Sequence, residues 1–100
     1  MIRGTTPTHT FNIPFDTSVI KEVRIIYAQD DIELFTKSTE DCELKDTNII
    51  VTLTQQDTFK FDHKKYVQIQ IRILTIYGEV LSSVIDKIGV SQCLSDEVLV

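Results

Sequence analysis

The segment Y-V-Q-I-Q-I-R-I-L-T, residues 66–75, decides the fold class. Apolar and polar residues alternate along it, one set being Val67, Ile69, Ile71 and Ile73 and the other Gln68, Gln70 and Arg72. Because successive side chains of a strand point to opposite faces, this period of two predicts a β-strand with one face on a core. We expect the other face to meet water or a partner, as in antiparallel sheets.

The rest of the chain consists of short apolar segments separated by polar turns. Turn residues occupy positions 14–18, 30–31, 45–48 and 77–78, and alternating apolar residues lie between them. This spacing predicts an all-β fold, a single immunoglobulin-like antiparallel β-sandwich of seven or eight strands. We prefer a sandwich to a closed barrel because the chain has only 3 glycines, and small barrels use glycine at their corners.

One short segment has a helical signal. Thr54 is followed three residues later by Asp57, the spacing of a helix-capping pair, so we expect a single helical turn there. Phe59 and Phe61 follow, and we expect both rings to enter the core beneath this turn.

Length and composition indicate one globular domain spanning residues 1–100, with flexible ends at 1–6 and 95–100. Hydrophobic residues make up 42% and charged residues 25%, which argues against disorder. The formal net charge of −5 disfavours a nucleic-acid partner, since such binding depends on Lys and Arg at phosphates.

The sequence contains no signal peptide and no apolar run of about 20 residues, so we expect a soluble protein made in the cytoplasm, without a membrane partner. In that reducing compartment Cys42 and Cys93 are expected to be small buried hydrophobes rather than a disulfide or metal pair. Whether the two cysteines meet in the fold stays open.

No pattern of catalytic or cofactor-binding residues is present. His9 and His63 have no spacing that pairs them with a nucleophile, and no C-x-x-C or H-x-x-x-H motif occurs. Ser82 and Ser83 lack the G-x-S-x-G context, and the acidic turns lack the D-x-D-x-D-G calcium pattern. We therefore expect a protein that is not an enzyme and that uses no cofactor or metal.

The best candidate interface lies on the polar side of segment 66–75 and at the turn after it. It consists of Gln68, Gln70, Arg72, Ile76 and Tyr77. The three polar residues suit either a hydrogen-bonded contact with another protein or an ordinary wet face, and the apolar pair at the turn favours an interface. The basic segment 59–65 is a weaker candidate for an anionic partner, and its lysines are equally well explained as solvated loop residues.

Residues 1–11 (M-I-R-G-T-T-P-T-H-T-F), 15–18 (F-D-T-S), 51–55 (V-T-L-T-Q) and 68–72 (Q-I-Q-I-R) resemble a group of small phage and prophage proteins of Gram-positive, often gut-dwelling, bacteria. The resemblance extends over nearly the whole chain. It implies phage origin and no particular activity.

A looser resemblance is to the N-terminal β-sandwich domain of phage baseplate upper proteins. Its marks are an R-G-[DT]-T start, a T-x-x-[ED]-T segment and a late turn, found here at 3–6, 54–58 and 75–80. The late turn departs from the pattern, because Tyr77-Gly78 replaces the usual Asp-Gly. These motifs are structural, so no binding residue is carried over.

The resemblance implies a non-enzymatic structural or assembly module of a bacteriophage particle, in the baseplate, tail or head surface. Its partners would be other phage structural proteins, with the chain acting as a homo-oligomer or docked on a larger assembly, and its location would be the virion. One alternative is a host-surface module that binds carbohydrate or protein through aromatic residues such as Tyr77 and Phe35. Another is an intracellular prophage accessory protein.

Overall fold

Strand β6 (Val67–Thr75) lies inside a four-stranded antiparallel sheet with the order β3-β2-β6-β7. The computed structural model describes residues 1–89 and 98–99. The other members of this sheet are β2 (Ile20–Gln29), β3 (Ile32–Ser38) and β7 (Val80–Ile88). A second sheet has the order β1-β5-β4 and consists of β1 (Thr8–Asn12), β4 (Cys42–Lys45) and β5 (Asn48–Thr52).

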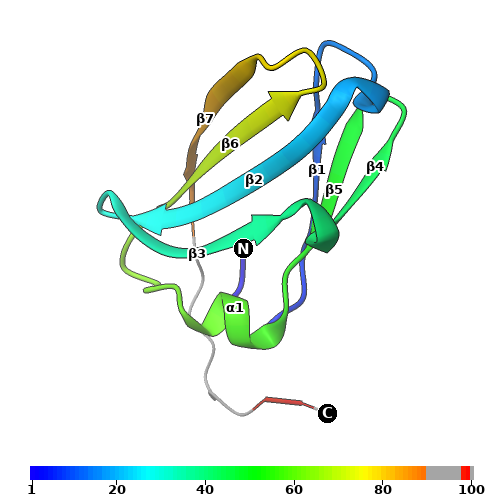
Figure 1. Cartoon of the computed structure of the whole chain (residues 1–100). Coiled ribbons are helices and arrows are strands. Elements are labelled where there is room, and N and C mark those ends of the chain that lie inside the picture. The colour runs from blue at the N-terminus through cyan, green and yellow to red at the C-terminus, as the bar shows by residue number, and fades with distance from the viewer. Residues whose placement is uncertain (90–97, 100) are drawn as a thin grey trace.

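The two sheets pack face to face, so the predicted all-β sandwich is confirmed (Figure 1). The strand order differs from that of a constant-type immunoglobulin domain. In a constant-type immunoglobulin domain the second strand pairs within the sheet of the first and fifth strands. Here β2 lies between β3 and β6, which leaves three strands facing four.

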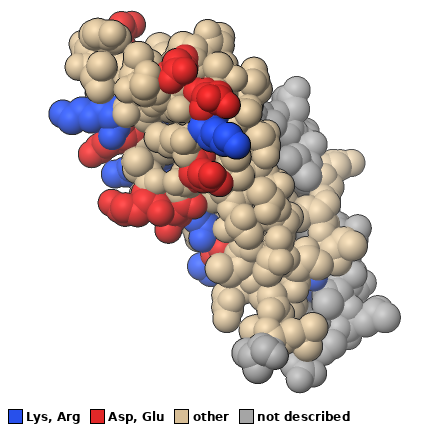
Figure 2. Space-filling model, turned by 90° about the vertical axis from the view of Figure 1, so that its right-hand side faces the viewer, with Lys and Arg blue, Asp and Glu red and all other residues tan. Residues whose placement is uncertain are grey.

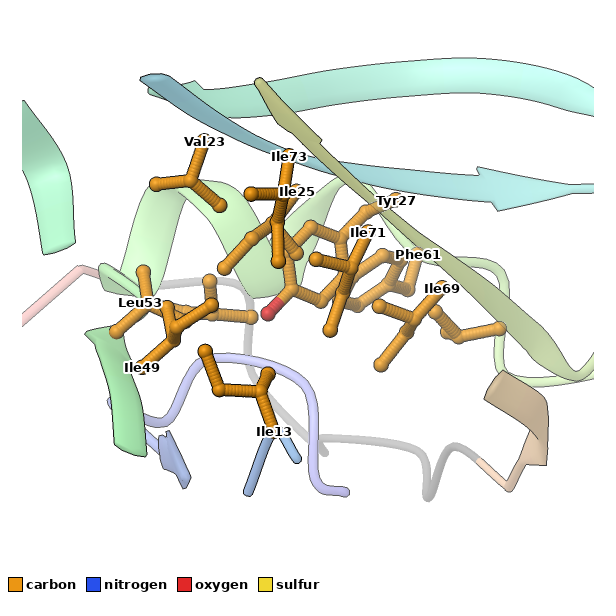
Figure 3. Packing of buried hydrophobic residues seen from close by; sticks show 12 residues of the cluster. Ile13, Val23, Ile25, Tyr27, Ile49, Leu53, Phe61, Ile69, Ile71 and Ile73 are labelled. Atoms are coloured by element: carbon orange, nitrogen blue, oxygen red, sulfur yellow. The ribbon is translucent and has the colours of Figure 1, made fainter. Parts of the chain in front are cut away.

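The core lies between the sheets and is built from the alternating apolar residues. Val67, Ile69, Ile71 and Ile73 of β6 are buried, as predicted. Figure 3 shows Ile69, Ile71 and Ile73 beside Val23, Ile25 and Tyr27 of β2, extending toward Ile13, Ile49 and Leu53 from the other side. Burying one such side chain fully stabilises the fold by roughly 1.5–3 kcal/mol.

The β2–β3 hairpin turns through Asp30 and Asp31, which both have positive φ angles (51° and 62°). Such angles suit a two-residue hairpin but favour Asn or Gly over Asp. Three contacts, made by Lys65 and Gln68, offset this strain. Lys65 Nζ lies 2.8 Å from Asp30 Oδ2, and the side-chain amide of Gln68 accepts a hydrogen bond from the Asp31 N–H (2.8 Å) and donates one to Asp31 Oδ1 (3.0 Å).

The predicted helical turn is present as α1 (Gln55–Phe59), and Thr54 and Asp57 form the expected capping box. Two 3₁₀ turns, η1 (Thr17–Val19) and η2 (Thr39–Asp41), complete the elements. Phe61 enters the core with 1% of its surface exposed, as predicted. The expectation for Phe59 is wrong, because it is only half-buried and its ring packs against Arg3 and Gly4.

The first residues of the chain are bonded to α1. The Gly4 N–H donates to Thr58 Oγ1 (2.9 Å), Thr58 Oγ1 donates to the Thr5 carbonyl (2.9 Å), and Arg3 Nη2 donates to the Phe59 carbonyl (3.0 Å). Two of the three segments that carry the baseplate resemblance, 3–6 and 54–58, therefore lie against each other. Flexibility of residues 1–6 and 95–100 stays a prediction, and residues 95–97 and 100 lie outside the described part.

Candidate interface on the outer face of the four-stranded sheet

Gln68, Gln70 and Arg72 lie side by side on the face of β6 that points away from the core. Their side chains are half-buried or exposed, whereas the residues between them are buried. On β2 they lie opposite Ala28, Ile26 and Arg24, in that order. The polar stripe expected from the sequence is thus the middle row of a surface contributed by β2, β6 and β7, which we call the outer face.

Gln68 has a structural role at one end of the outer face. Its amide is engaged by Asp31 in the β2–β3 turn, as described above. Two shallow hollows meet at these two residues, one of about 330 Å³ toward Ile26 and Gln70 and one of about 310 Å³ toward Lys64 and Tyr66. Because its hydrogen-bonding groups are used within the fold, Gln68 offers less to a partner than the sequence indicates.

Gln70 lies in the middle of the outer face. Its Nε2 donates to Ser82 Oγ on β7 over 3.1 Å. Gln70 lines the hollow together with Ile26 and Ala28 of β2 and with Asp31, Glu33 and Gln68. Apolar side chains with a few amides and carboxylates around them suit a protein contact, in which such polar groups fix the orientation.

Arg72 lies directly opposite Arg24 on β2, so two cations are neighbours across the strands. The Arg24 guanidinium contacts groups of its own strand: Nη1 donates to the Val23 carbonyl (2.9 Å), and Nη2 lies 3.7 Å from Glu22 Oε2. Among the side chains that the structure describes, which leave out those of residues 84–88, Arg72 has no carboxylate within ion-pair distance. Like charges directly opposite in a sheet destabilise it, so this corner favours binding of an anionic group.

The β6–β7 turn presents large apolar side chains next to these arginines. Ile76 is 56% exposed, Tyr77 72% and Val80 59%. The buried Thr75 organises the turn, since its hydroxyl accepts from the N–H groups of Tyr77 (3.3 Å) and Glu79 (3.2 Å). A fixed turn with exposed apolar residues is typical of a contact surface rather than of a solvated loop.

The sequence pattern did not identify the residues of neighbouring strands that complete this surface. Arg24 and Ile26 reach it through the β2–β6 pairing, which joins segments about 45 positions apart, and no local signal specifies such a pairing. Val80 joins this surface because the β6–β7 hairpin returns the chain beside β6. The sequence signal that could have identified Val80 is its position as an apolar residue directly after a predicted turn.

Phe35, expected together with Tyr77 to contact a sugar or protein in the host-binding alternative, lies in strand β3 and packs inward. Its ring stacks on Tyr27 with centroids 4.8 Å apart and lies 5.5 Å from that of Phe61. It is therefore part of the aromatic core. Of the two aromatic residues expected to contact a sugar, only Tyr77 is free to do so.

Two titratable side chains away from the outer face pair with each other. Lys37 Nζ and Asp57 Oδ2 form a largely buried ion pair of 2.6 Å between β3 and α1. Burial opposes ionisation of Asp57, but Lys37 and the Thr54 N–H hold the pKa of this carboxyl below its ordinary value. Burial raises the pKa of the Cys42 thiol, and Cys93 lies outside the described residues.

In residues 1–89 and 98–99 no cluster of three or more His, Cys, Asp or Glu is arranged to hold a metal ion. None of the described helices is long and apolar enough to cross a membrane. Figure 2 shows the side of the molecule at the right of Figure 1, where acidic and basic side chains are intermixed over the upper part. That face thus has no extended field of one sign.

Comparisons with known proteins find no match. No family model, no curated protein and no solved structure matches the chain. The phage and baseplate resemblances therefore rest on the short motifs of the sequence alone, and function has to be argued from the surface.

Proposed function

We propose that the chain is a non-enzymatic structural or assembly module of a bacteriophage particle, in the baseplate, tail or head surface, which acts through protein–protein contacts. The motifs at residues 1–11, 54–58 and 68–72 support the phage origin. The observation that carries the contact role is the outer face, where Arg72 opposes Arg24 beside the exposed Ile76 and Tyr77.

The chemistry of this corner specifies what a partner has to supply. A carboxylate of the partner next to Arg72 would relieve the like-charge pair and form a charge-assisted hydrogen bond. An apolar patch of the partner would cover Ile76, Tyr77 and Val80. Aromatic residues and Arg are the residue types enriched at interfaces, and Tyr77 and Arg72 belong to them. Another phage structural protein or a second copy of the chain fits this requirement.

The contact role is tested by particle incorporation of charge-reversed variants. A phage lacking the gene is complemented with wild-type chain, with Arg72→Glu, or with Lys45→Glu as a matched control on the other sheet. We expect Arg72→Glu to lower the copies per particle by about tenfold or more, because reversal places like charges at the contact. Lys45→Glu should be incorporated normally. Equal incorporation of Arg72→Glu and wild type would remove the outer face from the proposal.

A host-surface binding role is the second candidate, and the 72% exposure of Tyr77 at a turn is the observation that favours it. An aromatic ring at such a position can stack on a sugar. A glycan array that shows binding by wild type and none by Tyr77→Ala would support this role, and no binding by wild type would exclude it. An intracellular accessory role predicts abundant chain in the cytosol and none in particles.

A further inference from the structure

Among the strands that the structure describes, four lie at sheet edges, and they differ in how they are protected against pairing. On one side, β3 carries Glu33 and Lys37 and is interrupted by a bulge, and β4 has only four residues with two charges. Charges, bulges and short length are the usual protection of free edges. On the other side, β1 contains no acidic residue, no Lys, no Arg and no Pro. Strand β7 contains none over residues 80–85, and Asp86, Lys87 and a register shift follow only at its far end.

The backbone groups that β1 offers follow from its register. Ile13 N–H donates to the Thr47 carbonyl and Leu53 N–H donates to the Pro7 carbonyl, both over 2.9 Å. In an antiparallel pair the hydrogen-bonded positions alternate, so His9 and Phe11 also point their backbone groups at β5. The N–H and C=O groups of Thr8, Thr10 and Asn12 then point away from β5. Within the described part of the chain no strand pairs with this side of β1.

A groove lies next to this edge, because three strands face four. It has a volume of about 660 Å³ and runs between Phe11, Pro14 and Phe15 on one side and Ile71, Ile73 and Leu81 on the other. Leu81 lies opposite Ile73 on the core-facing side of β7 and is nevertheless 39% exposed. The inner face of β7 around Leu81 is therefore left uncovered by β1.

We propose that β1 accepts an added strand, an extended segment of a different protein that completes a sandwich of four strands on four. Its backbone would pair with Thr8, Thr10 and Asn12, which calls for about five residues. Its inward side chains would fill the groove over Ile71 and Leu81. They are apolar and uncharged, because no charged residue lines the groove to compensate a buried charge.

The overhang of β7 argues against a second copy of the chain at this edge. Leu81 of β7 stays exposed beside the groove, so β1 does not cover this part of β7. A two-fold axis that paired two β1 strands would therefore crowd the two β7 strands against each other. A lone extended segment avoids this collision. This site is separate from the outer face, so its test succeeds or fails independently of the proposed function.

The test is amide hydrogen exchange of the full chain, followed by NMR, with and without a blocked Thr-Val-Thr-Val-Thr-Val-Thr peptide. In the free chain the Thr10 and Asn12 amides should exchange fast and the Phe11 amide slowly. Saturating peptide should slow exchange at Thr10 and Asn12 by about tenfold or more, because a hydrogen-bonded amide exchanges only when its bond opens. The same peptide with Asp in place of Val should have no effect.

Two variants, Ser83→Lys and Thr10→Pro, test the site itself, and Thr52→Lys is the control. Ser83→Lys places a charge at an exposed position that lines the groove and should abolish the peptide effect, whereas Thr52→Lys, an exposed β5 residue facing away, should retain it. Thr10→Pro removes a free-edge N–H without touching a β1–β5 bond and should also abolish it.

The proposal is overturned if the wild-type amides show no slowing with peptide, or if Ser83→Lys responds like wild type. It is equally overturned if Thr10 and Asn12 are already protected in the free monomer, which would mean that the chain's own C-terminal segment occupies the edge. Protection that rises with protein concentration together with a doubling of mass would assign the edge to a second copy.

Discussion

His9 Nδ1 lies 2.7 Å from the Tyr27 hydroxyl, and the two rings stack with centroids 5.8 Å apart, which joins the two sheets of the sandwich. Tyr27 is fully buried, and in the described part of the chain its hydroxyl has no hydrogen-bond partner other than His9. The histidine is therefore a structural residue of the core boundary, and the fold should respond to its protonation.

The stability of the chain should fall as the pH drops from about 7 to about 5. Burial, and secondly the positive charge of the amino terminus, lower the pKa of His9 below its ordinary value. The unfolded chain then binds the proton more readily, so the His9 contribution is complete above its unfolded pKa and is lost as the pH falls through the lowered one. Urea unfolding at several pH values measures this. His9→Gln should flatten the slope, and His63→Gln should leave it unchanged.

The Lys37–Asp57 pair should contribute measurably because Asp57 also caps α1. Its carboxylate accepts from the Thr54 N–H over 2.9 Å and contacts Lys37 Nζ at 2.6 Å. We expect Asp57→Asn to lower the free energy of unfolding by about 2 kcal/mol, since Lys37 loses a largely buried partner. A double-mutant cycle with Lys37→Met separates the ion pair from the cap. A coupling energy near zero would show that the cap alone matters.

Gly4 should tolerate no side chain. Its φ is 77°, and a Cβ there would lie 2.7 Å from Cζ of Phe59. Gly78 is a matched control, because its φ is 82° but a Cβ would meet open space. Both changes to Ala carry the backbone strain, about 1 kcal/mol, and Gly4→Ala adds the collision. Thermal unfolding should rank Gly4→Ala clearly below Gly78→Ala, and equal values would contradict the contact between the chain start and α1.

Replacing Arg72 should stabilise the isolated chain while weakening its contacts. Arg72→Thr removes a like charge directly opposite Arg24 and adds a β-branched residue, so we expect a gain of about 0.2–1 kcal/mol. The gain should shrink at high salt, which screens exposed charges. Chemical denaturation at two salt concentrations measures it, and a loss of stability would show that Arg72 serves the fold.

The sequence predicted what depends on local pattern and left out what depends on distant pairing. The alternation at 67–73, the hairpin turns and the Thr54–Asp57 cap follow from rules spanning a few residues, and the structure confirms them. The position of Arg24 opposite Arg72 depends on the β2–β6 pairing, which only the whole fold specifies. Phe59 was misplaced for the same reason, since the chain start, far away in sequence, covers its ring.

The central claim, a structural role in a phage particle, is tested most directly by quantitative mass spectrometry of purified particles from the bacterium that carries the gene. The claim predicts the chain in a fixed number of copies relative to the major capsid protein, retained through repeated gradient purification. Chain found only in the cytosol, with none in the particles, would contradict it.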